Sequence, residues 1–220
     1  MRRKFMQKYN FTWFLLFTLI LCKSINARPI SYVGGWTIMQ MNDFKNHSIH
    51  LHYSPSIKYS IGYRGEYWRE KEWQFHGTQL NYLIKRLNTS TSQSNFYLKS
   101  GLGLAFTDFK QYEKKIETAL FSGLAFDWEN RQYYISYENK FNYNAKIDEI
   151  FIQKSRIGFA PYVGSYGDLH TWLILQVENI PKANKKIVFT PMIRIFKGDY
   201  LAETGLSNNK DFMFNFIKRF

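Results

Sequence analysis

Two short segments of the chain carry side chains that bind soft metal ions. Met39 and Met41 are two residues apart, and so are His50 and His52. Residues two apart in a β-strand point to the same face, so each pair presents its side chains together. Thioether sulfur combined with imidazole nitrogen suits copper, particularly Cu(I), better than it suits hard cations. The four residues therefore predict a copper site.

This site depends on how the two segments pair. If a hairpin turns at residues 44 and 45, Met39 lies opposite His50 and Met41 lies opposite Ser48. All four candidate ligands then share one surface. A shift of one residue would turn the two pairs to opposite faces. The alternative is that the methionines pack in an interior, where the histidines form hydrogen bonds.

Basic side chains recur on the polar faces of segments that alternate in hydropathy. These basic residues are Lys58, Arg64, Lys99, Lys140, Lys154, Arg156, Arg194 and Arg219. Three acids share these faces, namely Glu138, Glu178 and Glu203, so the eight bases exceed the acids by five. A basic interior lowers the electrostatic cost of moving an anion through a low-dielectric wall. We expect these bases to line a path for anions or small acidic solutes. The alternative is that they pair with the acids and with water, and nothing passes.

Serine and histidine could form a catalytic pair of the kind that lipid-modifying enzymes use. His47 and Ser48 are adjacent, however, and adjacent residues of a strand point to opposite faces, so they cannot form one dyad. His76 and His170 could meet a serine only from another strand. The chain has no G-x-S-x-G motif. We expect no catalytic residue, and a lipid-modifying enzyme stays an alternative.

The N-terminal segment has the pattern of an export signal. Arg2, Arg3 and Lys4 precede an apolar run over 11–22. This run is shorter than the roughly 20 residues that span a bilayer, and Ala27 offers a small residue for cleavage. We expect a signal peptide over 1–27 and one domain over 28–220. An uncleaved anchor is the alternative.

The composition limits the remaining classes of protein. Of the 220 residues, 45% are hydrophobic and 19% aromatic, which argues against disorder. The single Cys excludes a disulfide framework and a zinc site built from several cysteines. The net charge is +13, but five of the 30 basic residues and no acid lie in 1–27. Much of the positive charge therefore belongs to the export signal, and we expect no nucleic-acid partner.

The rest of the chain alternates with period two, which is typical of half-buried β-strands. Ile61, Leu98 and Phe214 lie on apolar faces of this pattern. We predict twelve strands, with ten as the nearest alternative. The twelve strands are 36–42, 47–53, 57–65, 73–83, 94–106, 117–128, 132–141, 150–161, 168–178, 186–196, 199–206 and 211–220.

The length of the link that follows a strand depends on whether the strand is odd- or even-numbered. Tight links follow even-numbered strands, at 54–56, 129–131 and 197–198. Longer polar links follow several odd-numbered strands, at 66–72, 107–116 and 142–149, although the link 84–93 breaks the tendency. A barrel with both termini in the periplasm has its short turns on that side. The parity therefore supports an even number of strands.

The last strand carries a further signal, because Phe212, Phe214, Phe216 and Phe220 share one face. An alternating final strand with a terminal Phe resembles that of bacterial outer-membrane β-barrel proteins, although Lys218 stands where these usually have an apolar residue. The resemblance implies an all-β, antiparallel, up-and-down transmembrane barrel in the outer membrane. In architecture it is similar to small twelve-stranded acidic-sugar porins.

The physics of lipid leads to the same fold. Backbone amides in lipid have no water to bind, so a spanning sheet must close on itself. The alternative is a secreted soluble β-sandwich or lipocalin-like barrel, which would turn its apolar faces inward. We expect a small passive channel with outer-membrane lipid and small solutes or anions as partners. We expect no cofactor apart from copper and no enzymatic activity.

Overall fold

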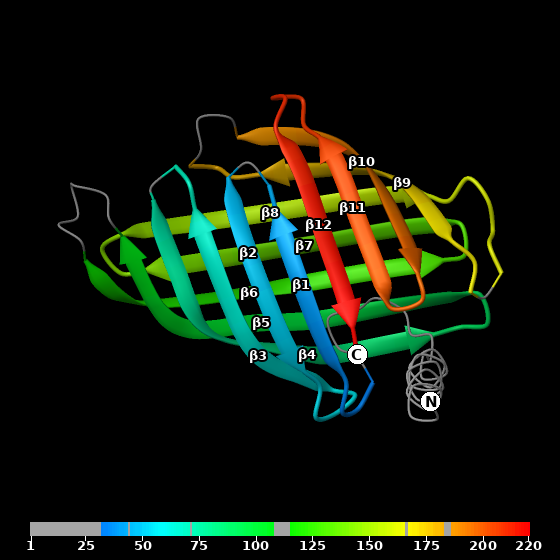
Figure 1. Ribbon diagram of the computed structural model, residues 1–220, viewed down its shortest axis with the longest axis horizontal. Helices are drawn as coiled ribbons and strands as arrows, with labels where there is room; N and C mark the ends of the chain where they lie inside the picture. Colours follow the sequence, from blue (N-terminus) through cyan, green and yellow to red (C-terminus); the bar gives the residue numbers. More distant parts are fainter. Residues whose placement is uncertain (1–31, 44, 71, 108–114, 166, 183–185) are drawn as a thin grey trace, which may run out of the picture.

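The computed structural model describes residues 32–220, except 44, 71, 108–114, 166 and 183–185. The predicted signal peptide, 1–27, lies outside the described residues. No helix in the described part of the chain has the length and apolar character needed to cross a membrane. The described elements are twelve strands (Figure 1): β1 (Trp36–Asn42), β2 (Asn46–Tyr53), β3 (Tyr59–Trp68), β4 (Trp73–Asn88), β5 (Ser92–Thr107), β6 (Ile116–Asn130), β7 (Tyr133–Asn144), β8 (Asp148–Phe159), β9 (His170–Asn179), β10 (Ile187–Lys197), β11 (Tyr200–Leu206) and β12 (Phe212–Arg219).

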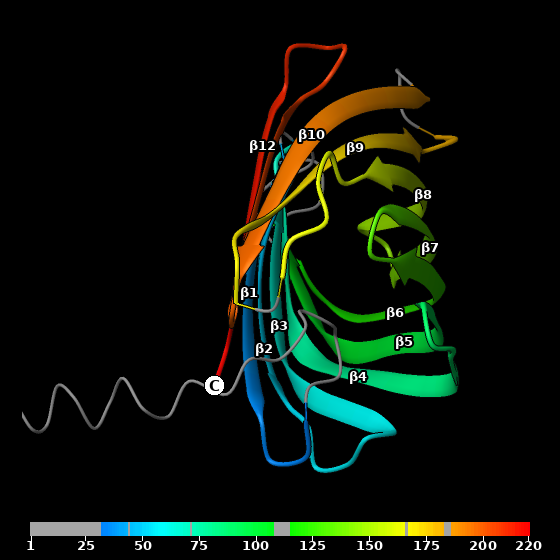
Figure 2. The same cartoon turned by 90° about the vertical axis from the view of Figure 1, so that its right-hand side faces the viewer.

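These strands form one closed antiparallel barrel, as the sequence predicted. Each strand pairs with its neighbours in sequence, and β1 pairs with β12 to close the sheet. At this seam Trp36 and Phe220 exchange two backbone hydrogen bonds, with N···O distances of 3.2 and 2.9 Å. Strands β1–β3 and β12 form one wall, and β5–β9 form the opposite wall (Figures 1 and 2).

The apolar faces point outward. Ile61 and Phe214 are 46% and 38% exposed, and Leu98 is half-buried on the same outer surface. Many other exposed side chains of the strands are Leu, Ile, Phe and Tyr. A soluble sandwich or lipocalin-like barrel would bury these residues in a shared core. The observed orientation is that of a barrel whose outer wall contacts lipid.

The predicted difference in link length between the two ends of the barrel is wrong in part, because β3 and β7 extend to Trp68 and Asn144. They shorten the predicted links 66–72 and 142–149 to 69–72 and 145–147. We call the end where β1 begins and β12 finishes the terminal end, and the opposite end the far end. The terminal end holds the links after even-numbered strands, which are short at 54–58, 89–91, 131–132 and 198–199 and long only at 160–169. The far end holds the links after odd-numbered strands, at 43–45, 69–72, 108–115, 145–147, 180–186 and 207–211.

Strand β4 corrects both the predicted end of the strand at residue 83 and the predicted link that follows it. It continues to Asn88, so the predicted long link 84–93 is wrong. Leu83 pairs with Tyr97 and Lys85 pairs with Phe96, which leaves Ile84 as the additional residue of a β-bulge. The bulge interrupts the period-two pattern without ending the strand.

The pattern also reverses along β4 near Gly77. Trp73 and Phe75 are buried inside the barrel, whereas Gln74 and His76 are exposed on the outer wall. Beyond Gly77 the order is the usual one, with polar side chains inside and apolar side chains outside. The interior of the barrel is therefore apolar near the start of this strand, at the far end.

Three apolar clusters fill parts of the interior. The first lies at the far end and comprises Trp68, Trp73, Phe75, Ala105, Ala119, Phe121, Ile147, Ile152 and Ile180. The second comprises Tyr134, Ala160, Trp172, Ile174, Met192 and Met213. The third comprises Leu83, Tyr97 and Ala125. The remaining interior is mainly polar, and the candidate site lies there.

Candidate functional site in the barrel lumen

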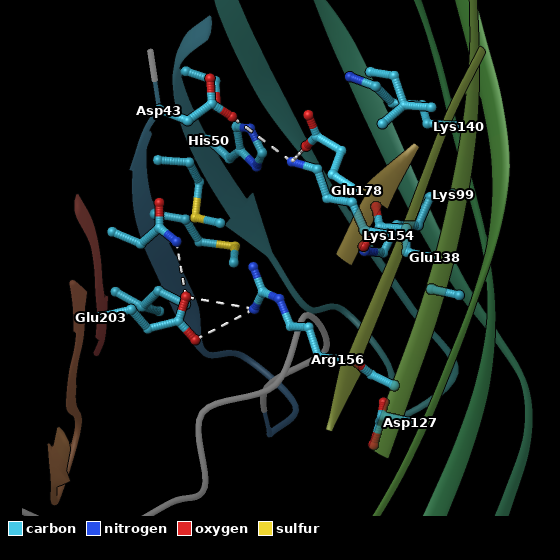
Figure 3. A pocket seen from close by; sticks show the side chains of 18 of the residues that line it. Asp43, His50, Lys99, Asp127, Glu138, Lys140, Lys154, Arg156, Glu178 and Glu203 are labelled. Atoms are coloured by element: carbon cyan, nitrogen blue, oxygen red, sulfur yellow. Dashed lines mark hydrogen bonds and ion pairs between the residues drawn. The ribbon is translucent and has the colours of Figure 1, made fainter. Parts of the chain in front are cut away.

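A cavity of about 270 Å³ lies inside the barrel and is lined by the inner faces of the strands. Among the described residues, seven bases and six acids line it (Figure 3). The bases are Lys45, Arg64, Lys99, Lys140, Lys154, Arg156 and Arg194, and the acids are Asp43, Asp127, Glu129, Glu138, Glu178 and Glu203. The cavity is thus highly charged, and its chemistry depends on how these groups pair.

Six of the bases are arranged in three clusters, each with two bases around one buried carboxylate. We call these the Glu66, Glu178 and Glu203 clusters after their acids. The side chains of these acids are only 1%, 8% and 3% exposed, whereas those of the six bases are 10–31% exposed. In each cluster the side chains of the two bases are therefore more accessible from the cavity than the carboxylate between them.

The Glu66 cluster joins opposite parts of the barrel. Glu66 on β3 accepts hydrogen bonds from Arg64 and, at 2.8 Å, from Lys140 on β7. Trp68 Nε1 donates to the other carboxylate oxygen at 3.0 Å. The Arg64 guanidinium and the Lys140 ammonium lie over the Phe121 ring at 4.8 and 5.5 Å. The far-end apolar cluster therefore fixes the position of these charges.

The Glu178 cluster lies near the link 43–45. Glu178 on β9 contacts Lys154 of β8 at 3.0 Å and Lys45 of the link at 2.9 Å. Asp43 approaches Lys154 at 3.8 Å. These contacts cross the lumen from β8 and β9 to the β1–β2 link, as Figure 3 shows for Asp43 and Lys154.

The Glu203 cluster joins four strands. Glu203 on β11 accepts a hydrogen bond from Arg194 Nε at 2.7 Å and another from Asn215 Nδ2 at 2.8 Å. Arg156 Nη1 lies 3.4 Å from the same carboxylate, and Arg156 Nε donates to Gln176 at 2.8 Å. Both arginines thus have fixed orientations in the wall.

A fourth ion pair joins Lys99 and Glu138, with Nζ 2.7 Å from Oε2. Unlike the three buried carboxylates, the Glu138 side chain is partly exposed. Among the acids that form ion pairs in the lumen, Glu138 is therefore the one most accessible to a solute.

The structure brings together six of the eight bases predicted to line the solute path. Arg64, Lys99, Lys140, Lys154, Arg156 and Arg194 line the cavity. The other two do not. Lys58 is exposed in the link 54–58, because β3 begins only at Tyr59. Arg219 is buried near the end of β12, opposite Thr37, outside the cavity lining.

The predicted excess of five bases falls to one in the cavity lining. Asp43, Asp127 and Glu129 also face the cavity, and Glu66 lies behind it. Glu66 was predicted to lie in a link, but β3 continues to Trp68 and places it inside. Strand ends and links give no reliable alternation, so the pattern could not assign these acids to the interior.

A second cavity, of about 390 Å³, adjoins the first towards the terminal end. Both cavities are lined by Glu129, Arg194 and Leu201. The link 89–91 and Gly164 of the link 160–169 line the second cavity, together with His170 and Trp172. The two cavities together extend from the link 43–45 to the terminal end.

The predicted metal ligands share one surface. In the β1–β2 hairpin, Met39 pairs with His50 and Met41 pairs with Ser48, so the predicted register is confirmed. Met39, Met41, His50 and His52 all line the first cavity. The described residues contain no group of three or more His, Cys, Asp or Glu side chains suited to a metal ion.

The remaining histidines make other contacts. His76 on the outer wall contacts Tyr63 Oη at 2.6 Å and Gln74 Oε1 at 3.1 Å. His170 stacks on Phe196, with ring centroids 4.5 Å apart. None of these contacts involves a serine hydroxyl, so they do not form the Ser/His pair considered for a lipid-modifying enzyme.

No protein-family model matches the chain, and no curated protein matches it. Its fold is similar to that of the KdgM porin in complex with disordered oligogalacturonate, with a TM-score of 0.49, 7% identity, and coverage of 84% of this chain and 98% of that one. LpxR from Salmonella typhimurium follows with a TM-score of 0.46, 8% identity, and coverage of 84% and 99%. The NanC porin matches with a TM-score of 0.42, 8% identity, and coverage of 84% of this chain and 97% of that one. The closed antiparallel barrel of twelve strands confirms the predicted fold class.

Proposed function

We propose that this chain lies in a bacterial outer membrane and that its lumen is a narrow aqueous path for small polar solutes, with a preference for anions. The apolar outer wall supports the membrane location, because soluble monomers rarely expose a large contiguous apolar surface. The closed sheet leaves no unpaired edge in lipid. The short links of the terminal end would then face the periplasm.

The two adjoining cavities support a path through the barrel. They follow one another from the link 43–45 to the terminal end and are lined by charged and polar groups. Such groups keep a lumen hydrated, and water-filled cavities of this kind conduct ions in porins. The apolar clusters narrow the lumen, so the expected solutes are small.

The Glu66 and Glu203 clusters carry the preference for anions. In each of them two cations surround one carboxylate, so each has a formal charge of +1, whereas Asp43, 3.8 Å from Lys154, offsets the charge of the Glu178 cluster. The Glu66 and Glu203 carboxylates are nearly fully buried and their bases partly exposed, so a solute beside these two clusters meets mainly ammonium and guanidinium groups. A positive surface in a low-dielectric wall attracts anions and repels cations.

Conductance in planar bilayers tests this proposal. The purified barrel is reconstituted under a KCl gradient, and we expect open-channel currents whose reversal potential has the sign of chloride permeation. Lys154→Gln should move this potential towards zero, because it removes a partly exposed cation and leaves the Lys45–Glu178 pair. Glu138→Gln should move it further towards chloride, because it removes the most accessible paired acid.

Lys182→Gln is the matched control, because Lys182 is itself exposed in the link 180–186, with only Glu149 as its ion-pair partner among the described residues. This substitution should leave the reversal potential unchanged. Absence of open-channel current, or a reversal potential with the sign of potassium permeation, would refute the anion path.

A further inference from the structure

The inner faces of β1 and β2 place a thioether beside two imidazoles. Met39 lies directly opposite His50 in the hairpin, and directly opposite residues of an antiparallel pair have β-carbons about 4.5–5.5 Å apart. His52 is two residues further along the same face, opposite Thr37, whereas Met41 lies opposite Ser48 on the other side of the Met39–His50 pair. The hairpin thus brings one sulfur donor, Met39, beside two nitrogen donors in the cavity wall.

The two imidazoles are buried with nitrogen atoms that no described group satisfies. His52 is 1% exposed, and neither its Nδ1 nor its Nε2 has a hydrogen-bond partner among the described residues. His50 is 7% exposed, and its Nε2 also has no such partner. Buried polar groups are normally hydrogen-bonded, so these rings call for a ligand or another explanation.

The rings are close enough to bind one ion together. Their centroids are 5.7 Å apart and their planes meet at 78°. An imidazole nitrogen binds a metal at about 2 Å, so an ion between two rings at this separation can reach a nitrogen of each. Met39, directly opposite His50, is then placed to contribute the third donor.

We propose that His50, His52 and Met39 form a site for Cu(I) in the lumen wall. Met41 lies opposite Ser48, about 13 Å along the strand from His52, and does not share the ion with it. Neutral sulfur and imidazole donors prefer this soft monovalent ion to hard cations. The site is independent of whether the lumen conducts anions.

The surrounding charges favour a monovalent ion over a divalent one. Arg64 lies opposite His50 on β3, and Glu66 and Gln79 hold its guanidinium. Lys99 also lines the cavity but is paired with Glu138. These three donors carry no charge, so repulsion from Arg64 would be about twice as large for a divalent ion as for Cu(I).

Competition with a chromophoric Cu(I) chelator, under anaerobic reducing conditions, tests the site. The full chain is refolded in detergent in a Cys22→Ser background, because Cys22 is the only thiol. We expect one Cu(I) per barrel. The variant His50→Ala with His52→Ala should abolish binding, and Met39→Leu should weaken it at least tenfold while keeping the side-chain volume. X-ray absorption should show sulfur and nitrogen scatterers around the ion.

Two matched substitutions control for general effects. Met192→Leu changes a buried methionine of the second apolar cluster, and His76→Gln changes a histidine of the outer wall. Neither should alter the affinity. Only barrels that keep the folded gel mobility before boiling are compared. Wild-type protein that binds no Cu(I), or binding that survives the double histidine variant in folded barrels, would overturn the proposal.

Discussion

Glu203 illustrates how one buried carboxylate organises the charges of the lumen wall. It accepts hydrogen bonds from Arg194 and Asn215 and lies 3.4 Å from Arg156 Nη1. These contacts offset the free-energy cost of removing the carboxylate from water. Without Glu203, the two guanidinium groups would lie in the wall with no carboxylate between them.

We predict that Glu203→Ala lowers the free energy of unfolding by about 3–5 kcal/mol, because removing one partner of a buried ion pair leaves an uncompensated charge. Urea titration of the refolded barrel, followed by tryptophan fluorescence, measures the change. Glu149→Ala is the control. It breaks the solvent-exposed pair with Lys182 and should change stability by no more than about 0.5 kcal/mol. Equal effects of the two substitutions would contradict the prediction.

At the scale of single residues, the sequence predicted the bases of the site better than its acids. Arg64, Lys99 and Arg156 lie within regular strands, where alternation determines which side chains point inward. Asp43 lies in a link, and its orientation depends on contacts that no local pattern contains. Its Oδ1 accepts hydrogen bonds from the backbone amides of Lys45 and Asn46, which leaves Oδ2 near Lys154.

Among the elements, β4 combines a bulge with a reversal of its polar and apolar faces. Ile84 is the residue without a cross-strand partner in the pairing with β5. Beyond it, Arg86 points inward again and donates a hydrogen bond to Asn95 at 2.7 Å. The bulge therefore lets the strand carry one additional residue without turning its last residues to the wrong face.

We predict that deletion of Ile84 is tolerated, because Lys85 would then follow Leu83 in regular alternation and Arg86 would keep its inward position. Deletion of Leu80, the control, should prevent folding, because it turns the residues that follow to the opposite face. Gel mobility with and without boiling distinguishes the two variants. Similar folding yields for both deletions would contradict this account of the bulge.

The two hairpins β1–β2 and β4–β5 show what local patterns can determine. A short turn fixed the register of Met39 against His50, so both the elements and their pairing were predictable. The end of β4 was not, because a bulge looks like a loop in a period-two pattern. Trp73 and Phe75 were also unpredictable as interior residues, since the cluster they join includes residues from distant strands and links.

For the molecule as a whole, the decisive property is which medium the outer wall contacts. Ile193 lies within β10 with Leu173 and Thr204 as its cross-strand neighbours. Val163 lies in the link 160–169 at the terminal end. Their exposed fractions are nearly equal, at 47% and 48%. The two residues therefore differ in their position along the wall and not in their accessibility.

We predict that Ile193→Lys destabilises the barrel in lipid vesicles by about 2–4 kcal/mol, since a lysine near the middle of the bilayer must leave water. Val163→Lys should cost no more than about 1 kcal/mol, because a link outside the hydrocarbon stays hydrated. Denaturant titration in vesicles gives both values. Equal, small effects would mean that the wall faces water, and the membrane location would be wrong.

The pairing of β1 with β12 determines when the barrel can close during folding. These strands are the first and the last of the barrel, so the ring cannot close until β12 has been made, and bringing Trp36 to Phe220 closes a very long loop. Until then β1 and β11 each present a free edge that can capture another chain. A chain whose ring is still open must therefore be shielded from other chains until β1 and β12 have paired.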